Sequence, residues 1–390
     1  MSVRHRAALS RWLCGASLLA LSACGENEST VGGVGATGAE GGVGGLGGSG
    51  AAGAGGIGGA GGIGGAGGAW DPSRFAECST WYTKIPPAPE VHPNSDDWVA
   101  DIVINSPNWH YSYTEWSVPV YRAEADTPLT TIDFRNESSN CHDGCVPEGC
   151  NEVPIPAGAT AAGQGSQPPD CVGYVRDGHM IVYSHDLRHE WDLYGACKTA
   201  AGQWVASCIR KVDRLGDGLF LEESAEPPSP RYDEKGACRA CPNALSHTII
   251  TYEEMTVQKE IRHAIGFAYW GELLADHWSL YPCTAYRAGI SDRPWAMNVG
   301  QRLFLRDDYD CAQHANESTR ILCVALQTYG LIFIENNGPG YNGIYLETLS
   351  DTPQTSPWNT EVDIESPIPI PLTPENFRAL SEPLEPACEP

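Results

Sequence analysis

The side chains best placed for chemistry lie on two candidate strands, near residues 179–183 and 190–194, which a polar turn joins. Side chains alternate between the two faces of a strand. The apolar positions, which should face the core, are Met180, Val182, Trp191 and Leu193. The opposite face then carries one imidazole, two carboxylates and two phenols: His179, Tyr183, Glu190, Asp192 and Tyr194. We expect this face to form the floor of a groove, since tyrosines are unfavourable on a surface that only contacts solvent. The alternative is the solvated face of an ordinary hairpin.

Acid–base catalysis is the chemistry that this set of groups suits. Asp177 precedes His179 by two residues, and a carboxylate beside an imidazole fixes its tautomer and raises its pKa. Glu190 and Asp192 would lie close by on the partner strand, and two carboxylates roughly 5–9 Å apart are what glycoside hydrolases use. A His or Tyr base opposite an acidic or amide group would instead suit a lyase acting on a uronic acid. A cross-strand His–Glu pair is also an ordinary surface feature.

Three further groups support a glycan-directed site. Glu137 lies in a polar segment, and Glu260 and His263 are three residues apart on a candidate helix, where they would pair. The alternative for His263 is a structural histidine beside an apolar stripe. Trp109 and Tyr111 begin the densest aromatic cluster in the chain, and aromatic faces of this kind stack on sugar rings. The alternative for both aromatic residues is a buried core.

The elements that must position these groups are mostly short strands separated by Pro, Asn, Asp and Gly. Candidate strands are residues 102–104, 117–121, 130–134, 180–183, 190–194, 204–210, 331–334 and 343–346. Two helices are expected, over residues 253–269 and 318–329, because apolar residues recur there at helical spacing. We therefore expect a mainly β fold, a β-sandwich or jelly-roll-like single domain with two or so short helices and disulfide staples.

The amino-terminal part predicts export and a lipid anchor. Residues 1–23 combine arginines, a short apolar run and small residues before Cys24, which is typical of a bacterial lipoprotein signal peptide. The alternative is an ordinary secretory signal. Residues 24–69 hold the lipidated Cys24 and a Gly/Ala-rich flexible tether, and residues 70–390 form the globular domain with a Pro-rich tail. We expect the protein in the cell envelope, facing the periplasm or the cell exterior, with the anchor as its only contact with the membrane.

Charge and cysteine content narrow the partners. The formal net charge is −25, and no basic patch with interleaved aromatic residues appears, so nucleic acid is not expected as a partner. The 15 cysteines suit an oxidising compartment. Plausible staples are Cys197–Cys208, Cys311–Cys323 and Cys78–Cys388, together with pairs among Cys141, Cys145, Cys150 and Cys171. We expect the cysteines of the CxxC segment at residues 238–241 to form structural disulfides and not a metal or redox site. No cofactor is expected. Structural Ca²⁺ could bind the acidic loop at residues 307–310, although this loop lacks the ligand spacing of an EF-hand.

Several short segments resemble, in order, those of a family of exported bacterial proteins with no established activity. The matching segments are residues 135–138, the Pro-Ile-Pro at 154–156, the Asp-x-His at 177–179, the YELY-like strand at 190–194, the EIxHALxF-like segment at 260–267, residues 298–305 and the ALKxYGMIxADNG-like segment at 325–338. The resemblance implies one structural unit from about residue 98 to 346 and implies no substrate. Residues 161–165 and 282–287 depart from the family pattern and lack polar groups that it carries.

Together these features predict a cell-envelope-anchored enzyme that cleaves a polysaccharide, as a glycoside hydrolase or a lyase. Its expected catalytic residues are His179, Glu190, Asp192, Glu137, Asp177 and His263, and its expected sugar-binding residues are Trp109, Tyr111, Tyr183 and Tyr194. The alternative is a non-catalytic surface module that binds a glycan or a protein. A third possibility is a structural envelope protein, which would have no pocket.

Overall fold

A computed structural model describes most of the chain beyond the tether. The described residues are 75, 79–105, 108–114, 116–135, 145–146, 149–172, 177–216, 218, 238–270, 275, 279–283, 291–293, 296–337 and 342–384. The expected signal, Cys24, the tether and Glu137 lie outside them, as do Cys78, Cys141 and Cys388. Within the described part, no helix has the length and hydropathy needed to cross a membrane.

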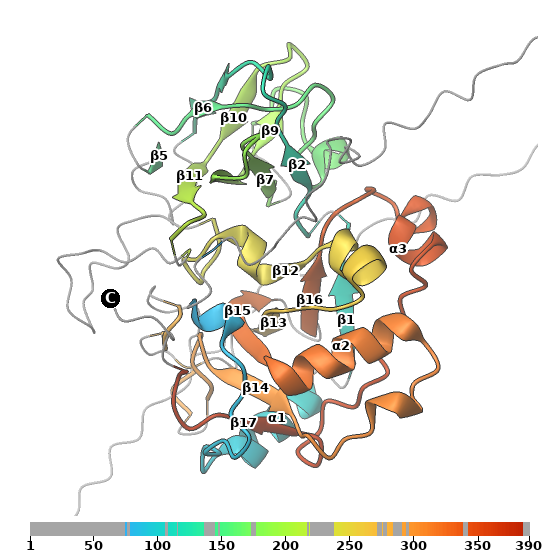
Figure 1. The fold of residues 1–390 in the computed structure, drawn as a ribbon. Coiled ribbons are helices and arrows are strands. Elements are labelled where there is room, and N and C mark those ends of the chain that lie inside the picture. Colours follow the sequence, from blue (N-terminus) through green and yellow to red (C-terminus); the bar gives the residue numbers. More distant parts are fainter. Residues whose placement is uncertain are drawn as a thin grey trace, which may run out of the picture. The chain divides into compact units, whose positions relative to one another are not determined.

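The largest sheet has seven strands and mixes parallel with antiparallel pairs (Figure 1). Its strands are β1 (Trp109–Ser112), β12 (Ile249–Ile250), β13 (Ile265–Trp270), β14 (Arg302–Leu305), β15 (Leu331–Asn337), β16 (Asn342–Leu346) and β17 (Phe377–Ala379). The order is β1-β16-β13-β15-β14-β17, and β12 pairs with β16. Helix α2 (Glu317–Thr328) joins β14 to β15, and its apolar side belongs to the same hydrophobic core as the sheet.

Smaller sheets build the part of the fold that carries the expected chemistry. A five-stranded sheet has the order β2 (Val120–Arg122), β7 (Met180–Tyr183), β8 (His189–Tyr194), β11 (Cys208–Asp213) and β5 (Cys145–Val146). A three-stranded sheet contains β4 (Asp133–Phe134), β10 (Trp204–Ala206) and β9 (Cys197–Lys198), and β3 (Thr130–Thr131) pairs with β6 (Glu152–Val153). The remaining helices are α1 (Ser95–Asn105), α3 (Pro357–Thr360) and short turns such as η5 (Leu245–Thr248), η6 (Glu254–Gln258) and η8 (Cys311–Gln313).

The predicted central hairpin is confirmed, with its expected register. Strand β7 runs antiparallel to β8, so that Met180 faces Leu193 and Tyr183 faces Glu190. The four apolar positions, Met180, Val182, Trp191 and Leu193, share one hydrophobic cluster. On the other face, however, Ile181 and Tyr183 belong to the main core. Both faces of the hairpin are therefore buried.

One predicted helix is confirmed and the other is wrong. Helix α2 agrees with the prediction for residues 318–329 and begins after Asn316, whose side chain accepts a hydrogen bond from the Thr319 amide. Residues 253–269 instead form the short turn η6 followed by strand β13. Lys259 adopts a left-handed conformation (φ 54°) that ends the turn. The β-branched and aromatic residues from Ile265 to Trp270 then pair with β15 and β16, which suits their strand propensity.

The strand predicted at residues 102–104 is also wrong, because these residues end helix α1. Trp98, Val99 and Ile102 are buried, and their spacing places them on one side of a helix. Two acidic residues, Asp96 and Asp97, occupy the first turn, where they favour a helix start.

The fold is mainly β, with a few short helices and disulfides, as expected at that level. A β-sandwich or jelly roll is not confirmed. Jelly rolls are built from antiparallel strands, whereas β1 pairs with β16, β13 with β15, and β2 with β7 in parallel.

The disulfides partly follow the prediction. Cys311–Cys323 is present as expected. Cys197 pairs with Cys171 rather than with Cys208, so the predicted staple across the β9–β10 turn is wrong. In the CxxC segment, Cys241 pairs with Cys283, and Cys238 is a buried free thiol.

Candidate functional site

The two carboxylates expected on a groove floor are enclosed. Glu190 and Asp192 each have 0% of their surface exposed. Turn η5 covers them: the Ser246 amide and hydroxyl donate to Glu190 at 3.1 and 2.7 Å, and the Leu245 amide donates to Asp192 at 2.9 Å. The expectation of an open groove here is wrong, because the main-chain and hydroxyl donors of η5 occupy the places that a substrate would need.

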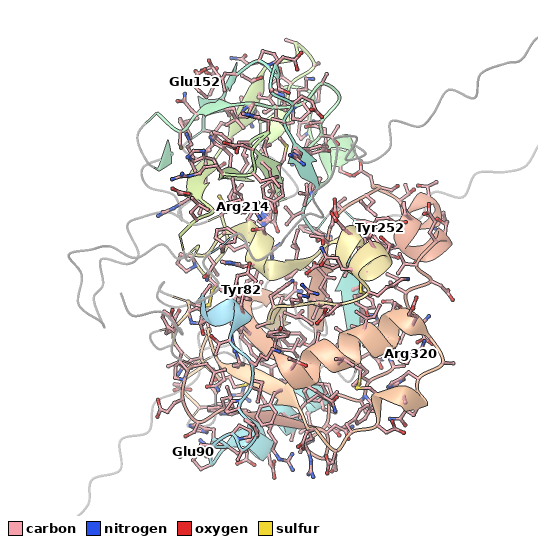
Figure 2. All side chains as sticks on the ribbon, viewed as in Figure 1. Tyr82, Glu90, Glu152, Arg214, Tyr252 and Arg320 are labelled. Carbon is pink, nitrogen blue, oxygen red and sulfur yellow. A yellow bond between two sulfur atoms is a disulfide. The ribbon has the colours of Figure 1, made fainter. Side chains whose placement is uncertain are left out.

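The electrostatics of this pair fit a structural role. The buried guanidinium of Arg214 (Figure 2) lies 3.5 Å from Glu190 and 4.3 Å from the centre of the Tyr183 ring. Burial raises the pKa of Asp192 well above its ordinary value, and the neighbouring Glu190 carboxylate raises it further. Asp192 therefore takes up a proton more readily than an ordinary aspartate, beside the Glu190–Arg214 ion pair. Because solvent does not reach these groups, a polysaccharide does not reach them either.

The other end of the same face opens into a small pocket. It has a volume of about 190 Å³, and His179 and Tyr194 line it at the point where β7 begins and β8 ends. The remaining lining residues come from the segment before β7, the CxxC segment and β15: Asp177, Cys238, Arg239, Ala240, Glu335 and Asn336. Three of the predicted site residues, Asp177, His179 and Tyr194, are therefore brought together.

A buried arginine forms one wall of this pocket. Nη1 of Arg239 donates to Glu335 at 2.9 Å, and its guanidinium lies 3.9 Å from the centre of the Tyr345 ring. The Tyr345 hydroxyl donates to the same carboxylate at 3.1 Å. Among the described residues, Nε and Nη2 of Arg239 have no hydrogen-bond partner. Unsatisfied buried donors are costly, so these two nitrogens are candidates for a ligand or for water.

His179 presents a neutral imidazole to the pocket. It is 2% exposed, its ring lies 5.3 Å from that of Tyr194, and Nδ1 has no hydrogen-bond partner within the described part of the chain. Burial lowers the pKa of His179 well below its ordinary value, and the charge on Arg239 lowers it further. We expected Asp177 to raise this pKa. That expectation is wrong, because burial and the Arg239 charge act in the opposite direction.

The other predicted site residues lie elsewhere. His263 contacts Glu254, with Nε2 3.1 Å from its carboxylate, whereas Glu260 pairs with Arg262 instead of His263. Burial acts to lower the pKa of His263, but the Glu254 carboxylate outweighs it, and the pKa is raised. This histidine is a buried structural residue.

The predicted sugar platforms are core residues. Trp109 is 2% exposed and Tyr111 is 4% exposed, and the Trp109 indole donates to the Ile370 carbonyl at 2.8 Å. Tyr183 is 3% exposed. None of these three rings has a face free to stack on a sugar, so the core alternative is the correct one.

The sequence did not indicate that Arg239 and Glu335 line a pocket. The CxxC pattern directs attention to its cysteines and not to the arginine between them, and the strand predicted at residues 331–334 ends before Glu335. An arginine between two cysteines of a disulfide-rich domain is the one signal that would have pointed to a buried cation. Across the described residues, no three His, Cys, Asp or Glu side chains gather as metal ligands would.

Comparison of the chain with family models, with curated proteins and with solved structures finds no match. The resemblance to a family of exported bacterial proteins stays a prediction that rests on its motifs.

Proposed function

We propose that this chain binds one sugar unit of a cell-surface polysaccharide in the His179 pocket. The observation that carries the proposal is a cluster of unpaired buried donors beside carboxylate acceptors. Arg239 supplies the donors, Asp177 and Glu335 supply the acceptors, Tyr194 supplies an aromatic ring, and Nδ1 of His179 donates or accepts according to the tautomer of the ring. Sugar hydroxyls both donate and accept hydrogen bonds, and sugar rings stack on aromatic faces, so a mixed set of this kind suits a saccharide.

The charge and size of the pocket narrow the ligand to a neutral sugar. Arg239 contributes one positive charge against the two carboxylates of Asp177 and Glu335, and His179 is neutral. A uronic acid or a sulfated sugar would meet net repulsion there. The volume of about 190 Å³ is below the roughly 300 Å³ at which drug-sized ligand pockets begin, which favours a single ring over a longer chain segment.

Polysaccharide cleavage at the same pocket is the second candidate function. The observation that favours it is the neutral imidazole of His179, which has a free nitrogen with which to take a proton. Asp177 or Glu335 would then be its acidic partner, in place of the enclosed pair on β8. Display on a lipid anchor at Cys24 would bring either activity to the cell envelope.

The test is a panel of neutral and acidic oligosaccharides offered to the purified full chain, with binding measured by calorimetry and cleavage measured by release of reducing ends. We expect neutral sugars to bind, and Asn336→Ala, which removes an exposed amide at the rim, to weaken binding about fivefold. The matched control is Asn359→Ala on α3, which should leave affinity unchanged. Absence of binding to every member of the panel would refute the proposal.

His179→Gln separates the two candidate functions. If the pocket is catalytic, this variant retains binding and loses at least about 100-fold in turnover, because the base is removed. If the pocket only binds, the wild-type chain shows no turnover to lose.

A further inference from the structure

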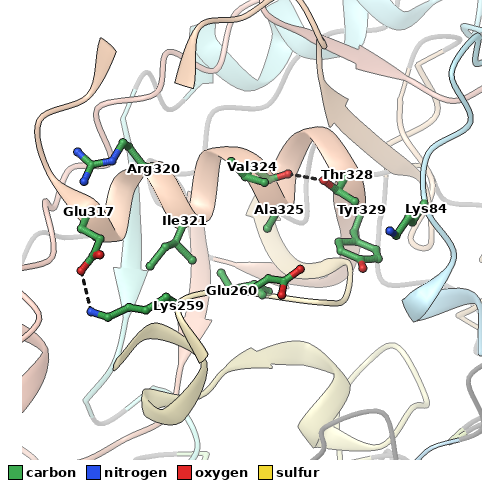
Figure 3. Close-up of a pocket in the computed structure, with 11 residues that line it drawn as sticks. Lys84, Lys259, Glu260, Glu317, Arg320, Ile321, Val324, Ala325, Thr328 and Tyr329 are labelled. Carbon is green, nitrogen blue, oxygen red and sulfur yellow. Dashed lines mark hydrogen bonds and ion pairs between the residues drawn. The ribbon is translucent and has the colours of Figure 1, made fainter. Parts of the chain in front are cut away.

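A second recess, separate from the His179 pocket, runs along helix α2 (Figure 3). Its volume is about 350 Å³. The floor is apolar and consists of Ile261, Ile321, Val324, Ala325 and Tyr329. The rim is charged and consists of Lys84, Lys259, Glu260, Glu317 and Arg320. Figure 3 shows the Lys259–Glu317 pair at one end of the recess and Lys84 beside Tyr329 at the other.

The apolar floor consists of core residues and one exposed residue, Val324, because the other four belong to the buried main core. Val324 is 51% exposed, whereas Leu322 and Leu326, on the side of α2 that faces the sheet, are fully buried. Exposed apolar surface in a recess with a polar rim is typical of a binding site. A volume of about 350 Å³ also lies within the range of ligand pockets, which begins at roughly 300 Å³.

The rim is positively charged in an acidic protein. Both of its carboxylates are already paired, Glu317 with Lys259 at 2.7 Å and Glu260 with Arg262 at 2.8 Å. Arg320 directs its hydrogen bonds to the main-chain carbonyls of His314 and Ala315. Lys84 is exposed and forms no ion pair with any described residue.

The surplus is therefore cationic, although the whole chain has a formal charge of −25. Potentials at interfaces are complementary, so the rim selects an anionic partner. A second copy of the chain or an anionic membrane would bring a large negative surface against the rest of this acidic molecule and would be repelled. A short peptide segment would contact the recess alone.

We propose that the α2 recess binds a short acidic peptide segment of another protein. One apolar side chain of the segment lies against Val324 and Ile321, and its carboxylates face Lys84 and Arg320. The proposal is independent of sugar binding, because no residue lines both pockets.

The experiment measures binding of fluorescent peptides to the purified full chain by anisotropy. Three peptides of equal length each carry one leucine, flanked by glutamates, glutamines or lysines. We expect the glutamate peptide to bind most tightly and to weaken as salt rises, because exposed charges are screened. Lys84→Glu should weaken its binding about fivefold, and Val324→Asp should abolish it.

Controls use matched residues outside the recess. Lys198→Glu, at an exposed lysine beside Trp204, and Leu129→Asp, at a leucine that is 62% exposed, should leave affinity for the peptide unchanged. Equal binding of all three peptides would overturn the proposal, as would an effect of Lys198→Glu equal to that of Lys84→Glu. Binding of anionic vesicles or self-association that Lys84→Glu abolishes, without peptide binding, would also overturn it.

Discussion

At the scale of single residues, the two carboxyl groups on β8 have different surroundings although they are neighbours on one strand face. Glu190 faces the Arg214 guanidinium, whereas Asp192 accepts a hydrogen bond from the Leu245 amide and lies close enough to Glu190 and Arg210 for their charges to act on its pKa. Removing one charged partner from a buried ion pair is costly, because the other charge is then left buried without a counter-charge. A buried acid whose pKa is raised loses less when an amide replaces it, because its charged form is already disfavoured.

We therefore predict unequal effects of two isosteric changes. Glu190→Gln should lower the free energy of unfolding by about 3 kcal/mol, because Arg214 loses its counter-charge. Asp192→Asn should change it by less than about 1 kcal/mol, since the amide oxygen still accepts the hydrogen bond from Leu245 and the charged form of Asp192 is disfavoured. Urea denaturation at pH 7 measures both. As a control, Asp213→Asn breaks an exposed pair with Arg188 and should cost less than about 1 kcal/mol. Equal effects at positions 190 and 192 would contradict this difference between the two carboxyl groups.

Glu347 should make stability depend on pH near neutrality. Burial raises the pKa of Glu347 to about 7. The Tyr252 amide, which donates a hydrogen bond to the carboxylate, acts to lower this pKa, and the Glu254 charge acts to raise it. The folded chain then holds a proton that the unfolded chain releases near pH 4.5, so stability falls as pH rises from there to about 7. Glu347→Gln should match the wild type at low pH and be about 3 kcal/mol more stable at pH 8, in urea denaturation at both pH values. The exposed Glu382→Gln is the control, and an equal difference at both pH values would contradict the prediction.

The sequence allowed the faces of the hairpin to be predicted, but not what covers them. Strand alternation places Glu190, Asp192 and Tyr183 on one face whatever lies above it. The covering turn η5 is more than 50 residues further along the chain, and nothing in the local pattern shows where it packs. Likewise, Arg239 becomes a pocket wall only through its pairing with Glu335, 96 residues away.

At the scale of elements, α2 was predictable because its apolar spacing and its disulfide agree. Residues 253–269 failed because Met255, Ile261 and Ala264 recur at helical spacing, whereas the strand-forming run begins at Ile265. Short apolar runs do not separate a helix from a buried strand by periodicity alone. Pairing with β15 decides the outcome, and pairing is not a local property.

The disulfide that ties η8 to α2 should stabilise this part of the fold. Cys311 and Cys323 are separated by 12 residues. Replacing both with alanine should lower the free energy of unfolding by about 3 kcal/mol, because the unfolded chain regains the entropy of the open loop. Urea denaturation measures the loss. Cys238→Ala, which removes a buried free thiol, should cost about 1 kcal/mol and is the control. A double variant as stable as the wild type would contradict the prediction.

At the scale of the whole molecule, the strand order could not be predicted. Strands that neighbour each other in the largest sheet are often distant in sequence, as β1 and β16 are. Composition and short strands predict a mainly β chain, but parallel pairing between distant strands depends on which faces fit in the folded core.

The lipid anchor is a prediction about the whole molecule. Cys24→Ser removes the thiol that would be acylated. In a bacterial host we expect this variant to move from the membrane fraction to the soluble fraction and to lack the mass of the acyl chains, because several chains anchor a protein stably. Fractionation with mass spectrometry tests this, with Cys14→Ser as the control within the apolar run. A Cys24→Ser variant that stays in the membrane fraction would contradict the prediction.

The central claim is that the polar face of the hairpin is closed over Glu190 and Asp192 and opens to a ligand only at His179. The most direct measurement is the nitrogen chemical shifts of the histidine rings by NMR while a neutral oligosaccharide is added to the full chain. We predict that the His179 signals move saturably and that those of the buried His247 and His263 do not. Unchanged His179 signals at a sugar concentration where calorimetry shows binding would contradict the account.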